Sequence, residues 1–352
     1  MIKIAIAGVG NLACGLVQAI FFYSNKENLQ KLRYPMIGNY KPEDIKIVAA
    51  YDIDERKVGK DLSDAIFEYP SVCEKKLNIN HLGVSVEKGV LLDEIPSPID
   101  KDIKISQQES SFKESLKKHR PDILLIAINS FAKNSLNEYF KIATELGINV
   151  INATPISLAT NDKMADLAKE NNTILIGDEI SGLVDSAIIH RVLLNLLSIP
   201  GIHLKASYQL DLADTLEGKL IMNDQCRDEL RNARTKILSD AFPDVSITAG
   251  SSDWVDFTKT NKVSYLWFDG KGGLESEFEI DLRISFDETY NCAVKLIDVI
   301  RATKLARDAS KSGVIQEICA YGFKYTTPDI VRKPYFEIVK AFENFISKCA
   351  GS

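Results

Sequence analysis

The first 22 residues constrain the fold of this chain more than any other segment. An apolar run at residues 2–7 leads into a Gly-Val-Gly-Asn-Leu-Ala turn, and a helix-like stretch follows at residues 16–22. Rossmann-type domains begin in this order, because Gly8 allows a tight turn, Gly10 lets the backbone approach a pyrophosphate and Ala13 permits close helix packing. The predicted cofactor contacts here are Gly8, Gly10, Asn11, Leu12 and Ala13. A tight turn that binds nothing is the alternative.

A second strand is predicted over residues 45–51, and it ends at Asp52. A carboxylate at this place would accept the ribose hydroxyls of NAD and repel the extra phosphate of NADP. Asp52 follows Gly10 by 42 positions, whereas about 20 are usual. We therefore expect a surface insertion over roughly residues 23–43. An aspartate that only starts a turn is the alternative for Asp52.

Polar residues follow the later strands of the same half. These strands are predicted over residues 122–128, 149–152 and 173–176, with a helix over residues 135–146 between the first two. Ser130, Thr154 and Asp178 come just after their respective strands. Because ligands bind at the carboxyl edge of an open parallel sheet, these three side chains are predicted to contact the cofactor.

The hydrophobic pattern changes in the second half. Strands are expected over residues 204–210, 263–268 and 277–286, and helices over residues 107–119, 291–310 and 335–349. The strict alternation at residues 277–286 predicts an antiparallel sheet with one solvated or helix-covered face. The expected fold class is α/β, a Rossmann NAD-binding domain with an inserted α+β catalytic and tetramerisation domain. Its predicted parts are residues 1–185, 186–290 and, as helices that return to the first domain, 291–352.

Composition narrows the classes of protein that the chain can represent. Its 352 residues, 45% hydrophobic and 26% charged, suit two globular cores. A net charge of −6 without a dense Lys/Arg run argues against nucleic-acid partners, and no apolar run is long enough to span a membrane. Six scattered cysteines and four distant histidines predict reduced thiols in the cytoplasm and no zinc site.

Seven short motifs occur in a fixed order along the chain. They are GVGNLAC (8–14), AAYDIDERKVGKDL (49–62), INATP (151–155), GDEISGLVDSAIIHR (177–191), YQL (208–210), NCAVKLIDVIRATKLA (291–306) and AYGFKYTTP (320–328). Their order and spacing resemble the short, prokaryotic-type myo-inositol-1-phosphate synthases. The resemblance covers nearly the whole chain, apart from about residues 63–120 and the last helix at residues 329–352.

The resemblance implies a specific reaction. Enzymes of this family bind NAD and convert glucose 6-phosphate to inositol 1-phosphate, in the service of inositol and phospholipid biosynthesis. A sugar hydroxyl is oxidised, an enolate forms beside the ketone, an aldol closure makes the ring, and the ketone is reduced again. Lysines and a bound monovalent or divalent cation stabilise the negative charges. The family also implies a cytoplasmic homotetramer that pairs through the α+β sheet.

Three residues match the catalytic residues of the family. Lys262 lies in TNKVSYLWFDG and Lys324 in GFKYTTP, where the family has active-site lysines. Asp287, in SFDETYN, matches a carboxylate near the nicotinamide and the reacting carbons. Ordinary surface lysines near strands are the alternative for Lys262 and Lys324.

Other family positions have changed. A family lysine reads Ser181, a second reads Leu238 and a third reads Arg234. Each lysine lost from an anion site should cost about 10²–10³ in rate. Residues 211–217 replace an Asn- and Gly-rich stretch and bring in aspartates, at 211 and 214, that would repel a phosphate.

Three explanations for these changes compete. The enzyme could act on a different, less anionic sugar, or Lys219, Arg234 and Lys236 could have taken over the cationic role. Alternatively, ring closure is lost, which leaves an NAD-dependent sugar dehydrogenase or a non-catalytic NAD-binding homologue. We rank a cyclitol-forming reaction first.

Two further groups of charged residues need an explanation. Asp298, Arg301 and Lys304 recur every three positions. This spacing predicts a salt-bridge ridge, either solvated or at an interface, at least as readily as a cofactor contact. His190 and Arg191 continue a predicted helix, and we expect both to be structural.

Overall fold

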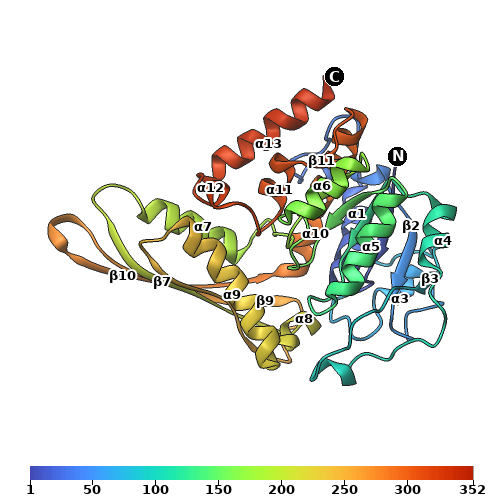
Figure 1. Cartoon of the computed structure of the whole chain (residues 1–352), viewed down its shortest axis with the longest axis horizontal. Helices are drawn as coiled ribbons and strands as arrows, with labels where there is room; N and C mark the ends of the chain where they lie inside the picture. The colour runs from blue at the N-terminus through green and yellow to red at the C-terminus, as the bar shows by residue number, and fades with distance from the viewer. Residues whose placement is uncertain (352) are drawn as a thin grey trace.

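The computed structural model describes residues 1–351, and its first sheet has seven parallel strands (Figure 1). In spatial order they are β11 (Gly313–Val314), β6 (Ile174–Ile176), β5 (Asn149–Asn152), β4 (Ile123–Ile126), β1 (Ile2–Ala7), β2 (Ile45–Asp52) and β3 (Val86–Lys88). The predicted Rossmann-type α/β class is confirmed. The strands that the sequence predicts for the first sheet agree with the observed ones within two residues at each end.

Helices cover both faces of this sheet because its strands are apolar on both sides. The isoleucines of β1 pack toward one group of helices, while Ala5 and Ala7 of the same strand face the other. The first group is α1 (Asn11–Tyr23), α10 (Glu288–Asp308), α11 (Gln316–Gly322) and α13 (Tyr335–Ala350). The second group is α4 (Phe112–His119), α5 (Lys133–Glu145) and α6 (Asp162–Glu170). Short helices are α2 (Lys26–Leu29), α3 (Leu62–Ala65) and α12 (Pro328–Val331).

The second sheet has four strands and is mixed rather than antiparallel. In spatial order they are β10 (Glu277–Asp287), β9 (Asn261–Lys271), β7 (His203–Ala213) and β8 (Ser246–Trp254). The prediction of an antiparallel sheet was wrong for β8, which runs parallel to β7. The reason is the connection through α8 (Leu216–Lys219) and the long helix α9 (Asp224–Ala241), which carries the chain back before β8 begins.

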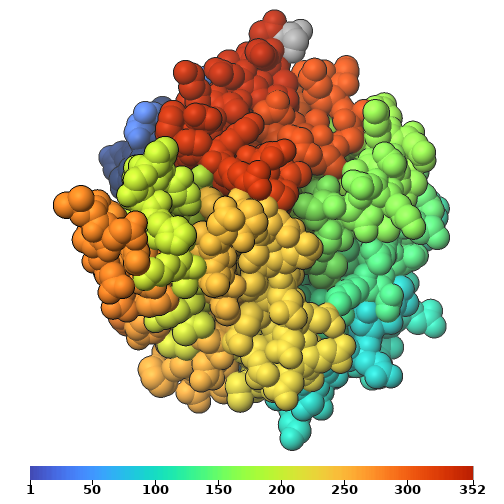
Figure 2. Space-filling view, turned by 60° about the vertical axis from the view of Figure 1, so that its left-hand side comes forward, coloured from blue at the N-terminus to red at the C-terminus, as the bar shows by residue number. Residues whose placement is uncertain are grey.

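Helices α7 (Ser186–Leu197) and α9 lie on one face of the second sheet, as Figure 1 shows. On the face drawn in Figure 2, the yellow surface around α9 lies against the red C-terminal segment and the green surface of the first sheet's helices. The predicted domain boundaries near residues 185 and 290 stay a prediction. Within residues 1–351, no helix combines the length and the apolar character that a membrane crossing requires.

Asp298 and Arg301 form a buried ion pair, so the expectation of a solvated or interface ridge was wrong for them. Arg301 is fully buried and donates to Asp298 at 2.7 Å, and Asp298 also accepts from the Tyr321 hydroxyl at 2.8 Å. Arg301 further donates to three main-chain carbonyls within residues 34–40. The cause is the burial of most of α10, where Lys304 is the one residue of the predicted ridge that is not buried. The pair thus fastens the predicted insertion to the core.

Replacing Arg301 by methionine should lower the free energy of unfolding by about 3–5 kcal/mol, because it leaves the buried Asp298 without its cation. Urea denaturation measures the loss. The control is Arg33→Met, which removes an exposed ion pair with Glu343 and should cost less than about 1 kcal/mol. Equal losses in the two variants would contradict this role for Arg301.

Candidate active site

One cavity of about 310 Å³ lies between the two sheets. Its wall includes residues that follow β1, β2, β4, β5 and β6, at the carboxyl edge of the first sheet. The opposite wall comes from α8, α9, β9, the start of α10 and the loop after α11. The cavity therefore joins the glycine turn to the segments that carry the predicted catalytic lysines.

The glycine turn has a shape that only glycine permits at Gly8 and an open space at Gly10. Gly8 has φ +97°, and a Cβ atom there would lie 2.4 Å from the carbonyl oxygen of Ala127. A Cβ atom on Gly10 would meet no atom within 4 Å, and Gly10 lines the cavity. Helix α1 begins at Asn11 with no side-chain cap and no acidic residue in its first turn. The turn thus leaves room for a ligand beside the positive end of a helix dipole.

Asp52 and Lys57 hold this turn from both sides of Val9. Asp52 accepts the main-chain N–H of Val9 at 2.8 Å, and Lys57 donates to the Val9 carbonyl at 2.6 Å. The two charged groups lie 3.9 Å apart. Both line the cavity, so the carboxylate predicted to contact a ribose lies beside the predicted pyrophosphate cradle.

The other predicted cofactor residues divide into two groups. Asn11, Leu12 and Thr154 line the cavity. Ala13 lies on the buried face of α1, in the core, and Ser130 is buried beside the cavity wall. The buried main-chain N–H of Ser130 donates to Glu217.

Asp178 shapes a loop rather than the cavity wall. It is fully buried, and its carboxylate accepts main-chain N–H groups of residues 158–160. The Asn152 side chain donates to it as well, at 2.7 Å. These donors account for both carboxylate oxygens, so Asp178 fixes the segment after β5, which includes Thr154.

Lys262 and Lys324 meet at one carboxylate oxygen. Lys262 Nζ lies 2.8 Å from Oε1 of Glu288, and Lys324 Nζ lies 3.3 Å from the same oxygen. All three side chains line the cavity. Burial opposes their charge, but neighbouring carboxylates, including Glu288, raise the pKa of both lysines. The structure therefore brings together two lysines that are 62 positions apart in sequence and keeps them protonated.

Asp287, the carboxylate predicted for this site, caps helix α10 instead of lining the cavity. It accepts the Tyr290 main-chain N–H at 2.8 Å and the Thr260 hydroxyl at 2.7 Å. The adjacent Glu288 points to the lysines. Sequence reasoning missed Glu288, although the preference for Asp at helix N-caps indicates that Asp287 would serve as the cap.

Arg234 is the candidate replacement cation that reaches the cavity. It lies on α9, donates to Asp211 at 2.9 Å and also pairs with Glu179. Lys236 is 74% exposed and pairs with Asp240, and Lys219 pairs with a carboxylate at position 102. The structure thus singles out one of the three cations that the sequence proposed as substitutes.

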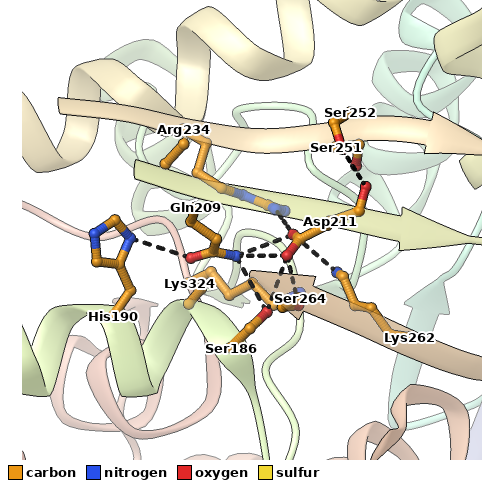
Figure 3. A network of polar contacts seen from close by, with 12 residues as sticks. Ser186, His190, Gln209, Asp211, Arg234, Ser251, Ser252, Lys262, Ser264 and Lys324 are labelled. Carbon is orange, nitrogen blue, oxygen red and sulfur yellow. Dashed lines mark hydrogen bonds and ion pairs between the residues drawn. The ribbon is translucent and has the colours of Figure 1, made fainter. Parts of the chain in front are cut away.

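Asp211 supports the cations from behind the cavity wall (Figure 3). It is 1% exposed and accepts from Ser264 at 2.6 Å and from Gln209 at 3.0 Å, besides its ion pairs with Arg234 and Lys262. Burial opposes ionisation, but the two cations lower the pKa of Asp211. Asp211 was expected to repel a phosphate. In the structure it instead positions Arg234 and Lys262.

Asp214 and the two positions of lost lysines also lie outside the cavity wall. Asp214 accepts the main-chain N–H of Lys259 at 2.8 Å. Ser181 is fully buried and donates to the Gly322 carbonyl at 2.9 Å, and Leu238 belongs to the core of the second sheet. Asp214 and Ser181 therefore bind main-chain groups, and Leu238 packs in the apolar core.

Glu217 is a second cavity residue that sequence reasoning missed. One of its oxygens accepts the main-chain N–H of Ser130 at 3.1 Å and the Asn129 side chain at 3.2 Å. The other, Oε1, is buried and has no hydrogen-bond partner among residues 1–351. Burial raises the pKa of Glu217, and the charge of Glu179 adds to the effect. The residue joins α8 to the edge of the first sheet and leaves an acceptor at the cavity.

The charged cluster around the lysines has one more carboxylate than cations, so it is not a net cationic site. Its cations are Lys262, Lys324 and Arg234, and its carboxylates are Asp185, Asp211, Glu179 and Glu288. Burial opposes the charge of Glu179, but Arg234 and Lys324 lower its pKa to about 2. In the described part of the chain, no three His, Cys, Asp or Glu side chains are grouped to hold a metal ion.

His190 lies beside this cluster, and its protonation makes the free energy of unfolding depend on pH. It is fully buried between Gln209 and Ser207, and burial lowers its pKa to about 4 from an ordinary 6.5. Its neutral form therefore stabilises the fold above pH 6.5, and this contribution disappears as the pH falls toward 4. Between pH 7.5 and 4.5 we expect His190 to account for a loss of ~2–3 kcal/mol in the free energy of unfolding.

Urea denaturation of His190→Gln at the two pH values tests this effect. The variant should lose less stability than the wild type between pH 7.5 and 4.5. His81→Gln, at an exposed histidine, should keep the wild-type loss. Identical pH dependence in the wild type and His190→Gln would rule the assignment out.

Comparisons with known proteins agree with this architecture. No protein-family model matches the sequence. The inositol-3-phosphate synthase of Mycolicibacterium smegmatis is 29% identical over 336 residues, which cover 92% of each chain. The enzyme of the same name from Mycobacterium tuberculosis is 27% identical over 331 residues, which cover 92% of this chain and 90% of the relative.

A solved structure shows the same fold. The myo-inositol-1-phosphate synthase-related protein from Thermotoga maritima superposes with a TM-score of 0.82 at 18% identity, over 99% of this chain and 98% of its own. The curated relatives match nearly the whole chain, as the order of its motifs predicted. This chain is therefore similar, along nearly its whole length, to the inositol-3-phosphate synthases.

Proposed function

We propose that the protein is an NAD-retaining isomerase that converts a sugar phosphate into a cyclitol phosphate. The reaction would follow the family's order of hydroxyl oxidation, enolisation, intramolecular aldol closure and ketone reduction. The observation that supports this proposal is one cavity that joins the glycine turn to the cluster of Lys262, Lys324 and Glu288. We also propose a cytoplasmic homotetramer paired through the second sheet.

The residues at the glycine turn fit NAD. The space beside Gly10 and the uncapped start of α1 suit a pyrophosphate, and Asp52 suits a ribose. The residues that would hold the cofactor are Gly8, Gly10, Asn11, Leu12, Asp52 and Thr154. NAD supplies a hydride acceptor for the first step and a hydride donor for the last.

The lysines and glutamates supply the remaining chemistry. Lys262 and Lys324 are protonated donors at the cavity wall, so they can stabilise the oxygen that gains charge when the substrate enolises. Glu288 holds both ammonium groups at one place. Glu217 Oε1, which accepts no hydrogen bond from the described residues, would accept the proton from the carbon beside the ketone, and the raised pKa of Glu217 favours that role.

Incubation with NAD and a panel of hexose phosphates, followed by NMR of the products, tests the proposal. A cyclised product without net NADH supports it. Net NADH would identify a sugar dehydrogenase instead, and tight NAD binding without turnover would identify a non-catalytic homologue. Because the carboxylates of the charged cluster outnumber its cations by one, the panel should include less anionic sugars, which the alternative of a different substrate predicts.

Gly10→Ala should weaken NAD binding about tenfold and leave the melting temperature unchanged. The new methyl group enters the open space where the pyrophosphate would lie, and φ at Gly10 is −101°, which alanine adopts. Isothermal titration with NAD measures the change. The matched variant Gly8→Ala should instead lower the melting temperature, because its Cβ atom would meet the Ala127 carbonyl. Wild-type NAD affinity in Gly10→Ala would exclude this turn as the cofactor site.

A further inference from the structure

A second, smaller cavity lies on the other side of Arg234 and Lys324. Its volume is about 20 Å³, which is room for one water molecule or one ion of similar size. Arg234 and Lys324 line both cavities, and Arg191 of α7 lines only the smaller one. The remaining polar side chains at its wall are those of Gln209 and Tyr325. No carboxylate lines this cavity in the described part of the chain.

Arg191 carries a buried charge for which residues 1–351 supply no counter-ion. It is 3% exposed, and its Nε and Nη2 atoms have no hydrogen-bond partner. Its guanidinium lies 5.8 Å from the centre of the Tyr335 ring. Burial lowers the pKa of Arg191, and Tyr335 alone opposes that effect. A guanidinium stays charged in proteins, so burial without a partner is costly.

The neighbouring cations, Arg234 and Lys324, have carboxylate partners. Arg234 pairs with Glu179 and Asp211, while Lys324 pairs with Glu179 and Glu288. These carboxylates belong to the side of the larger cavity and to the space behind its wall. Arg191 is thus the cation at the smaller cavity that has no ion-pair partner among the described residues.

We propose that this cavity is an anion site, in which a halide-sized anion or one oxygen of a phosphate group binds to Arg191 beside Arg234 and Lys324. A water molecule could accept one hydrogen bond from the guanidinium but would leave its charge unbalanced. An anion both accepts the hydrogen bond and balances the charge. The anion can come from solution, or it can be the phosphate of the substrate. The second source rests on the proposed function, and the first does not.

Bromide is the direct probe of the site. Crystals of the full chain soaked in sodium bromide should show an anomalous peak beside the Arg191 guanidinium. A peak that is absent from this cavity while bromide binds elsewhere, with a water molecule at Arg191, would overturn the proposal.

Thermal unfolding tests the same site in solution. At equal ionic strength, inorganic phosphate should raise the melting temperature by ~2–4 °C relative to the bulky anion gluconate. Arg191→Met should abolish this difference, and Arg191→Lys should keep much of it. The control Arg227→Met, at the surface of α9, should retain it fully. An equal phosphate effect in the wild type and Arg191→Met would overturn the proposal.

Competition separates the two sources of the anion. If the substrate supplies it, inorganic phosphate should compete with glucose 6-phosphate, and Arg191→Met should weaken binding of glucose 6-phosphate at least tenfold but not that of glucose. If the anion is free, glucose 6-phosphate should bind equally well to both proteins. Either result supports an anion site once bromide is located there. A protein without sugar turnover would contradict the proposed function and leave the bromide and phosphate results intact.

Discussion

Lys262→Met is expected to lower turnover by about 10²–10³-fold while NAD binding stays as in the wild type. Lys262 is 6% exposed, lines the cavity and donates to Glu288 at 2.8 Å. Methionine keeps the length of the side chain but removes the donor that would stabilise the enolate oxygen. The glycine turn belongs to the other wall of the cavity, so the cofactor should still bind. Turnover by NMR and titration with NAD measure the two effects separately.

Two companion variants make the test specific. Lys271→Met changes a lysine at the far end of the same strand, where it pairs with Glu275 at 3.2 Å, and should leave turnover unchanged. Lys262→Arg keeps the charge and should recover part of the activity. Because loss of a buried partner also destabilises the fold, rates are compared at a temperature where each variant is folded. Turnover within twofold of the wild type in Lys262→Met would remove this lysine from the mechanism.

The first sheet could be predicted from the sequence because its strands are short, continuous apolar runs. The run at β1 and the run at β4 each end in turn-forming or polar residues, so local composition defines both strands. Helix α9 shows the opposite case. Its outward surface is so polar that only Leu238 and Ala241 are buried, and its apolar pattern is too weak to indicate a crossover between β7 and β8.

The candidate site could be predicted only in part, because its residues come from separate elements. Resemblance identified Lys262 and Lys324, but Glu179 and Glu217 enter the cavity through the packing of one sheet on the other. No spacing in sequence encodes these contacts. Asp211 illustrates the same limit, because its charge alone predicted repulsion, whereas its burial between Arg234 and Lys262 gives it a supporting role.

The second large effect concerns two adjacent carboxylates. Glu288→Gln should lower turnover about 100-fold, because it removes the charge that holds both lysines at one point of the cavity wall. The charge of Glu288 also raises the pKa of Lys262 and Lys324. The variant should therefore shift the alkaline limb of the pH–rate profile to lower pH, which loss of packing alone would not do.

Asp287→Asn is the matched control, one residue earlier in the chain. Asparagine is as good a helix N-cap as aspartate, so α10 should still begin at Glu288 and turnover should stay within about threefold of the wild type. The family resemblance points to Asp287, whereas the start of α10 turns Glu288 toward the lysines. A larger loss in Asp287→Asn than in Glu288→Gln would favour the resemblance. The expected order instead assigns the carboxylate by helix geometry, since the two oxygens of Asp287 accept from Tyr290 and Thr260 at the start of α10, whereas Glu288 contacts both ammonium groups.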